Sequence, residues 1–191
     1  MDVCLAASVD EFFHEVVSDA LSAVELDASE PASWYLVGLL GEFTKARLTD
    51  EPLGLKLAAA QNENLGERVK NLKQVGDTSL YVAGFFAESL SRSLVDVDYY
   101  VGIGQNAYAQ LARSFGSGKP LADVYQELAA GFPKFVDVLS EVRKRTHLAE
   151  QSATTDIAKL YEIWLRTREE WVEKKLRAAG VLVDSSTKVP Q

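Results

Sequence analysis

The most informative segment for the fold is LYVAGFFAESLSRSLVDVDYYVGIGQNAY, residues 80–108. It contains six aromatic side chains, with glycine, alanine and serine residues between them. It lies within a longer segment, residues 65–112, in which apolar and small residues return every three or four positions. That spacing places them on one face of an α-helix. We therefore expect a long central pair of helices, joined by a turn over residues 91–97.

Small residues occupy the middle of the face that the two helices are expected to share. They are Gly76, Ser79 and Ala83 in the first helix, and Gly104 and Ala112, on either side of Tyr108, in the second. A glycine inside a helix costs about 1 kcal/mol relative to alanine, but it allows a second helix to come close. Asp96 or Asp98 is the expected N-cap of the second helix.

The rest of the chain also reads as helical, because neither strand-like alternation nor a hairpin turn signal occurs in it. Ser8 and Glu11 have the spacing of a capping box and are expected to open the first helix. Pro31 suits the first turn of the second helix, whose apolar run over 34–40 predicts a buried core segment. A helix over 134–147 and a separate long last helix over 157–179 complete an all-α bundle of about eight helices.

Chain length and composition predict one all-helical domain over residues 1–180, followed by a flexible tail over 181–191. The single cysteine, Cys4, allows no intramolecular disulfide, and no apolar run is long enough for a membrane span. We therefore expect a cytoplasmic protein that does not contact membranes.

The net charge of −8 is unevenly distributed. Residues 1–44 contain nine acidic residues and no lysine or arginine. An acidic region of this kind argues against nucleic acid as a partner, because binding to phosphates requires a basic surface. It is either a solvated helix face or a docking surface, for a basic partner or for the chain's own basic C-terminal third.

Few residues are suited to catalysis. Glu11 and His14 have the E-x-x-H spacing of di-iron bundles, but the other histidine, His147, is preceded at that spacing by Lys144. There is no nucleophile elbow and no phosphate-binding loop. We expect no cofactor and a non-enzymatic protein. A cryptic metal-dependent enzyme that uses Glu11 and His14 is the alternative.

The turn between the central helices carries the candidate ligand-binding residues, which are Arg92, Asp96, Asp98, Tyr99 and Tyr100. Carboxylates, phenols and a guanidinium could line a pocket for a small molecule or a lipid-like ligand, as helical bundles place such sites between helices. The same residues could instead cap and pack the helices.

Two tryptophans of the last helix, Trp164 and Trp171, lie seven residues apart and are candidate interface anchors. The many helix seams and the few catalytic residue types favour a helical interaction or regulatory module. We expect it to associate with itself or with a protein partner.

The segments FFAESL (residues 85–90) and LVDVDYY (residues 94–100) resemble a signature of uncharacterised, all-helical bacterial proteins. The resemblance covers about a quarter of the chain. It implies a bacterial, cytoplasmic and helical protein, and it brings no function with it.

Overall fold

The computed structural model describes residues 2–45, 48, 51–91, 95–167, 173, 176 and 177, and for residues 2–8, 148–160, 162, 163, 166 and 167 it describes the backbone alone. The chain forms two compact units, residues 1–144 and 145–191. The single domain over 1–180 stays a prediction, and the tail over 181–191 lies outside the described residues.

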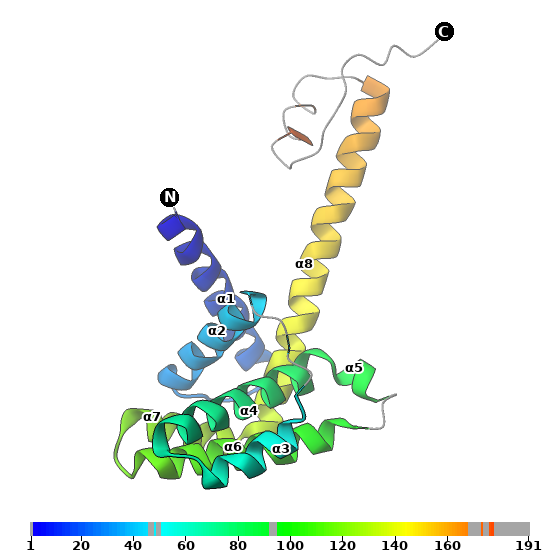
Figure 1. Ribbon diagram of the computed structural model, residues 1–191. Coiled ribbons are helices and arrows are strands. Elements are labelled where there is room, and N and C mark those ends of the chain that lie inside the picture. The colour runs from blue at the N-terminus through cyan, green and yellow to red at the C-terminus, as the bar shows by residue number, and fades with distance from the viewer. Residues whose placement is uncertain are drawn as a thin grey trace. The chain divides into compact units, whose positions relative to one another are not determined.

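The described residues form helices and no strands, so the predicted all-α fold is confirmed (Figure 1). In chain order the helices are α1 (Asp2–Val24), α2 (Glu30–Lys45), α3 (Leu53–Ala59), a 3₁₀ helix η1 (Ala60–Asn62), α4 (Leu65–Phe85), α5 (Ala87–Leu90), α6 (Val97–Phe115), α7 (Pro120–Ala130) and α8 (Phe132–Thr167). Within the described part of the chain, none of them is long and apolar enough to cross a membrane.

Helices α4 and α6 pack closely against each other, as the small residues predict. A Cβ atom built on Gly76 would lie only 2.4 Å from Cε1 of Tyr108. One built on Gly104 would lie 2.1 Å from Cζ of Phe132 and 2.9 Å from Cβ of Ser79. These separations are shorter than any van der Waals contact, so the two glycines are what allows the aromatic rings to fit.

The core of the first unit lies between these helices and their neighbours. Its largest fully buried side chains come from α2, α4, α6, α7 and the start of α8, and they include Leu36, Leu40, Leu72, Leu80, Tyr108, Leu111, Leu128, Phe132, Phe135 and Leu139. Helices α1 and α2 form a hairpin (Figure 1). Phe13, Val17 and Ala20 of α1 join the same core, which fixes the hairpin to the unit.

Two of the expected helix starts are confirmed. Asp96 caps α6, because its Oδ1 accepts a hydrogen bond from the backbone N–H of Tyr99 at 3.1 Å. Pro31 lies in the first turn of α2, which begins at Glu30. Both helix starts depend only on residues that are close in the sequence, so the sequence alone was sufficient to predict them.

Other boundaries differ from expectation. Helix α1 already runs through Ser8, so the proposed capping box is wrong; residues 2–7 contain no helix breaker. Helix α4 ends at Phe85, before the expected turn, and α5 follows. Helix α8 continues through residues 148–156, where a break was predicted, because capping residues alone do not interrupt a helix where the stretch itself contains no glycine or proline.

Candidate functional site

A buried polar cluster lies at the centre of the first unit. Asp77 of α4 is buried, with 3 % of the residue exposed. Its Oδ1 accepts hydrogen bonds from Oη of Tyr35 at 2.5 Å and from Oη of Tyr108 at 2.8 Å. Its Oδ2 accepts one from Nζ of Lys73 at 2.6 Å. We call Tyr35, Lys73, Asp77 and Tyr108 the Asp77 cluster; it joins α2, α4 and α6.

Burial controls the protonation of this cluster. It raises the pKa of the Asp77 carboxyl, although the charge of Lys73 and the donated hydrogen bonds act in the opposite direction. Burial acts to lower the pKa of Lys73, but the charge and hydrogen bond of Asp77 outweigh it, so that this pKa lies above its ordinary value. Burial also raises the pKa of Tyr35 and of Tyr108, and Asp77 raises both further. The phenols therefore remain donors.

The hydrogen bonds of the Asp77 cluster hold the fold together. Both carboxylate oxygens already accept hydrogen bonds from side chains of the chain itself. A buried polar network that is satisfied in this way fixes one arrangement of the helices that contribute to it. The cluster was not predicted from the sequence. The available signal was Asp77, an acid directly after Gly76 of the small-residue face, together with Lys73 four residues before Asp77.

The predicted ligand residues of the 91–100 turn are only partly brought together. Asp96 serves as the N-cap of α6, and Asp98 is exposed in its first turn. The rings of Tyr99 and Tyr100 meet edge to face, with centroids 5.4 Å apart. Arg92 lies outside the described residues. Two surface hollows that the structure describes are lined by other residues, so ligand binding at this turn stays a prediction.

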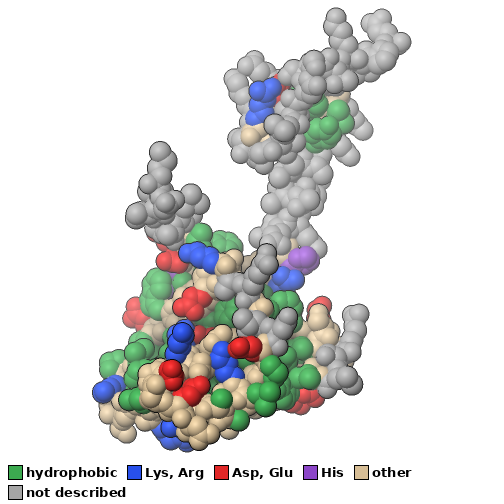
Figure 2. Space-filling model, in the orientation of Figure 1, with side chains coloured by type: hydrophobic (Ala, Val, Ile, Leu, Met, Phe, Trp, Pro, Cys, Tyr) green, Lys and Arg blue, Asp and Glu red, His purple; other side chains and the backbone are tan. Residues whose placement is uncertain are grey.

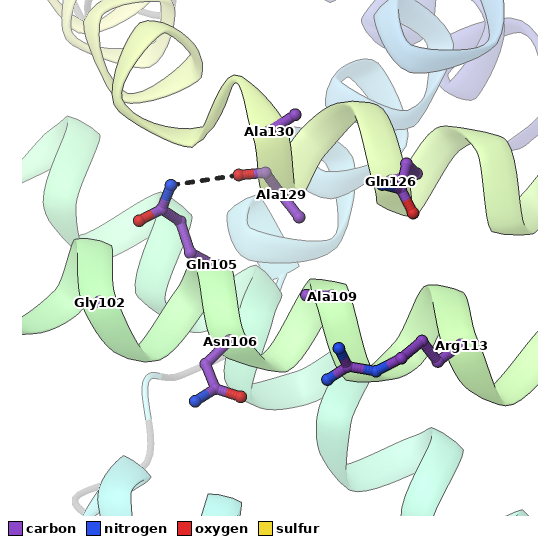
Figure 3. A pocket seen from close by; sticks show the side chains of 8 residues that line it. All are labelled: Gly102, Gln105, Asn106, Ala109, Arg113, Gln126, Ala129 and Ala130. Carbon is purple, nitrogen blue, oxygen red and sulfur yellow. Dashed lines mark hydrogen bonds between the residues drawn. The ribbon is translucent and has the colours of Figure 1, made fainter.

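The larger of these hollows lies between α6 and α7 and has a volume of about 590 Å³ (Figure 3). Small residues and amides line it, together with one guanidinium: Gly102, Gln105, Asn106, Ala109, Arg113, Gln126, Ala129 and Ala130. Nε2 of Gln105 donates to the carbonyl oxygen of Ala129 at 3.2 Å across it. None of these eight side chains is a carboxylate, imidazole or thiol, so they supply no acid–base pair for catalysis.

The hairpin presents an exposed aromatic residue. Trp34 of α2 is 47 % exposed, and its ring centroid lies 4.4 Å from that of His14 on α1. This corrects the prediction of a buried segment over 34–40: Leu36, Val37, Leu39 and Leu40 are buried, whereas Trp34 and Gly38 are not. The error arose because an apolar run on a helix must still turn one side outward.

The α1–α2 hairpin, which carries Trp34, is acidic. Every acid of the hairpin whose side chain is described is exposed, namely Asp10, Glu11, Glu15, Asp19, Glu25, Asp27, Glu30 and Glu42. Figure 2 shows hydrophobic and acidic side chains next to one another over α1 and α2. Lys45, the last residue of α2, is the first lysine or arginine of the chain. The hairpin therefore combines an apolar anchor with a negative potential.

The candidate metal ligands lie on the outside of this hairpin. Glu11 and His14 are both exposed on α1, and the His14 ring packs against Trp34. Among the residues whose side chains are described, no group of three histidine, cysteine, aspartate or glutamate side chains is placed to hold a metal ion. The geometry therefore gives Glu11 and His14 no further carboxylate or imidazole partner within that part of the chain.

The candidate interface residues lie in the second unit. Trp164 is 3 % exposed, and its ring contacts that of Tyr161 at 5.8 Å. A ring so deeply buried in its own chain is not presented as an anchor on the surface. Trp171 lies outside the described residues. Of the tryptophans that the structure describes, Trp34 is the exposed one.

Comparisons with protein-family models, with curated proteins and with solved structures find no match for this chain.

Proposed function

We propose that this protein is a non-enzymatic interaction module that binds a helical protein segment through its α1–α2 hairpin. The observation that carries the proposal is the exposure of Trp34, 47 % of whose surface is open to solvent. Tryptophan is the residue type most enriched among the side chains that dominate protein–protein binding energies. In a folded chain a half-exposed tryptophan is unusual, because its large apolar ring is normally buried.

Three further features support the hairpin as the binding surface. Phe12 on α1 is 45 % exposed and adds a second aromatic residue. The exposed acidic residues of the hairpin disfavour non-specific aggregation. The hairpin is also held by buried side chains and by the hydrogen bond of Tyr35 to Asp77, so it offers a preformed helical surface, which lowers the cost of binding.

The test uses the full chain and three matched synthetic peptides of about 18 residues, a length at which helices begin to form in isolation. All three carry the same leucine face, and their polar positions are all lysine, all glutamate or all glutamine. Binding is measured by calorimetry, and self-association by sedimentation velocity. We expect binding of at least one peptide or of a second copy, and Trp34→Ala should weaken it about tenfold or more.

Leu55→Ala is the matched control, because Leu55 is 70 % exposed on α3, outside the hairpin. Both variants should retain the circular dichroism of the wild-type protein, since neither side chain is buried. The proposal is wrong if no peptide binds and the chain remains a monomer at high concentration. It is equally wrong if Trp34→Ala and Leu55→Ala behave alike.

A further inference from the structure

Two glycines of α2 lie on the same outward face as Trp34. Gly38 and Gly41 follow the tryptophan at intervals of four and three residues, which puts all three on one side of the helix. A Cβ atom built on Gly38 would meet no atom within 4 Å, and one built on Gly41 would meet only Oδ1 of Asp10, at 4.0 Å. We call this face of Trp34, Gly38 and Gly41, in which the indole is followed by two positions without a side chain, the notch.

The core of the same protein shows what such glycines do when they are covered. Gly76 and Gly104 lie under the rings of Tyr108 and Phe132, which no larger residue would allow. Both Gly38 and Gly41 weaken the helix in the same way, yet no described side chain of the protein packs onto Gly38. The notch therefore has the form of a helix contact whose second helix is missing from this chain's described residues.

Acidic side chains near the notch favour one kind of partner helix. Asp10 borders Gly41, and Glu30 lies one turn before Trp34 on the same helix. Both carboxylates belong to side chains that are exposed. The one lysine on this side of α2 is Lys45, one turn beyond Gly41 at the end of the helix. A partner that covers Trp34 and both glycines must bring its own polar flanks close to these acids, which favours lysine and arginine there.

We infer that the Trp34–Gly38–Gly41 face binds a basic amphipathic helix of a partner protein, with a bulky apolar side chain seated over Gly38 and lysine or arginine residues beside Asp10 and Glu30. This inference rests on the proposed function and names the chemistry of its partner. Small residues allow the two helix axes to approach closely. The opposite charges on the two sides speed association and set the orientation of the bound helix.

The three peptides described above also test the partner's charge. We expect the lysine peptide to bind more tightly than the glutamine peptide, and the glutamate peptide to bind most weakly. Added salt should weaken the binding of the lysine peptide, because it screens exposed charges. If the glutamate or glutamine peptide binds as tightly through Trp34, the inference of a basic partner is wrong while the proposed function stands.

A second variant tests the position of the notch. Gly38→Leu fills it with a side chain at an exposed position where nothing obstructs the new Cβ, so the protein should fold as before. We expect this variant to bind the lysine peptide about tenfold more weakly than the wild-type protein does. Gly102→Leu should bind it with unchanged affinity. Gly102 is the matched control, since it is exposed on α6 and its Cβ position is also free. Equal affinities for the wild-type protein and Gly38→Leu would overturn the placement.

Discussion

Glycine and aromatic residues occur in two regions of the molecule, the contact between α4 and α6 and the hairpin of α1 and α2. They are buried at the contact, whereas several of them are exposed on the hairpin. In the first, glycines lie beneath aromatic rings and the buried Asp77 accepts three hydrogen bonds. In the second, Trp34 is half exposed and Gly38 is uncovered. Small and aromatic residues in a helix therefore indicate a helix contact, but they do not show whether the second helix belongs to the same chain.

Substituting glycines in the two regions should give opposite results, and this is the largest effect we expect. Gly104→Ala places a methyl group inside the ring of Phe132, which is fully buried, and should lower the free energy of unfolding by about 3 kcal/mol. Gly38→Ala meets no neighbour and should raise it by up to about 1 kcal/mol, because alanine favours the helix. Urea unfolding followed by circular dichroism measures both. If both substitutions change the free energy of unfolding in the same direction, the distinction between covered and uncovered glycines is wrong.

The buried carboxylate should matter more than the exposed one that reaches the same lysine. Asp77→Ala leaves the phenols of Tyr35 and Tyr108 without their acceptor and should cost about 2 kcal/mol. Glu42→Ala removes a carboxylate that lies 3.4 Å from Lys73 and is 64 % exposed, so the loss should stay within about 0.5 kcal/mol. Calorimetric melting of the two variants at one pH provides the comparison. Equal losses would mean that the Asp77 cluster does not stabilise the packing of α2 on α4 and α6.

Alkaline pH should destabilise the folded protein through its buried phenols. The pKa values of Tyr35 and Tyr108 are raised in the folded protein, so above about pH 10, the ordinary value, the unfolded chain releases phenol protons that the folded one retains. The free energy of unfolding then falls as pH rises, by about 1.4 kcal/mol per pH unit for each such group. The raised pKa of Lys73 acts in the same direction.

Tyr35→Phe should make this fall shallower by the contribution of one group, measured as the slope of urea stability between pH 10 and 11. Tyr99→Phe is the control, since Tyr99 is 42 % exposed and lies outside the Asp77 cluster. An unchanged slope in Tyr35→Phe would show that its phenol ionises as readily in the folded protein as in the unfolded one.

Much of the fold could be predicted because it depends on local spacing. The face of Gly76, Ser79 and Ala83 is set by helix periodicity, and the cap at Asp96 needs only a carboxylate three residues before a free backbone N–H. The break at Phe86 could not be predicted in this way. Its residue types are compatible with continuing the helix, so its position follows from the tertiary packing around it.

The candidate sites depend on tertiary convergence and were therefore harder to foresee. Tyr35 lies 42 positions before Asp77, and Tyr108 lies 31 after it; no spacing rule connects them. The exposure of Trp34 likewise depends on which side of α2 meets the core. The sequence did indicate the acidic region over residues 1–44, because charge needs no fold to be counted.

The smallest expected effect lies in the turn that connects the two hairpin helices. Glu25 follows the last residue of α1 with a φ of 56°, a left-handed conformation that costs a residue with a side chain about 1 kcal/mol. The backbone N–H groups of Glu25 and Leu26 close the helix by donating to the carbonyl oxygens of Ser22 and Leu21 at 3.2 and 3.0 Å, the pattern that usually carries glycine at this position. Glu25→Gly should therefore raise the free energy of unfolding by somewhat less than about 1 kcal/mol, since glycine also gains freedom in the unfolded chain.

Ala23→Gly, two residues earlier and still inside α1, is the control and should lower stability by about 1 kcal/mol. Thermal unfolding of both variants, compared with the wild-type protein, separates a strained turn from a general tolerance of glycine. If Glu25→Gly is destabilising as well, the glutamate side chain makes a contact that outweighs the backbone strain. The hairpin would then be held at its turn, in addition to the core side chains of α1 and α2 that already fix it to the first unit.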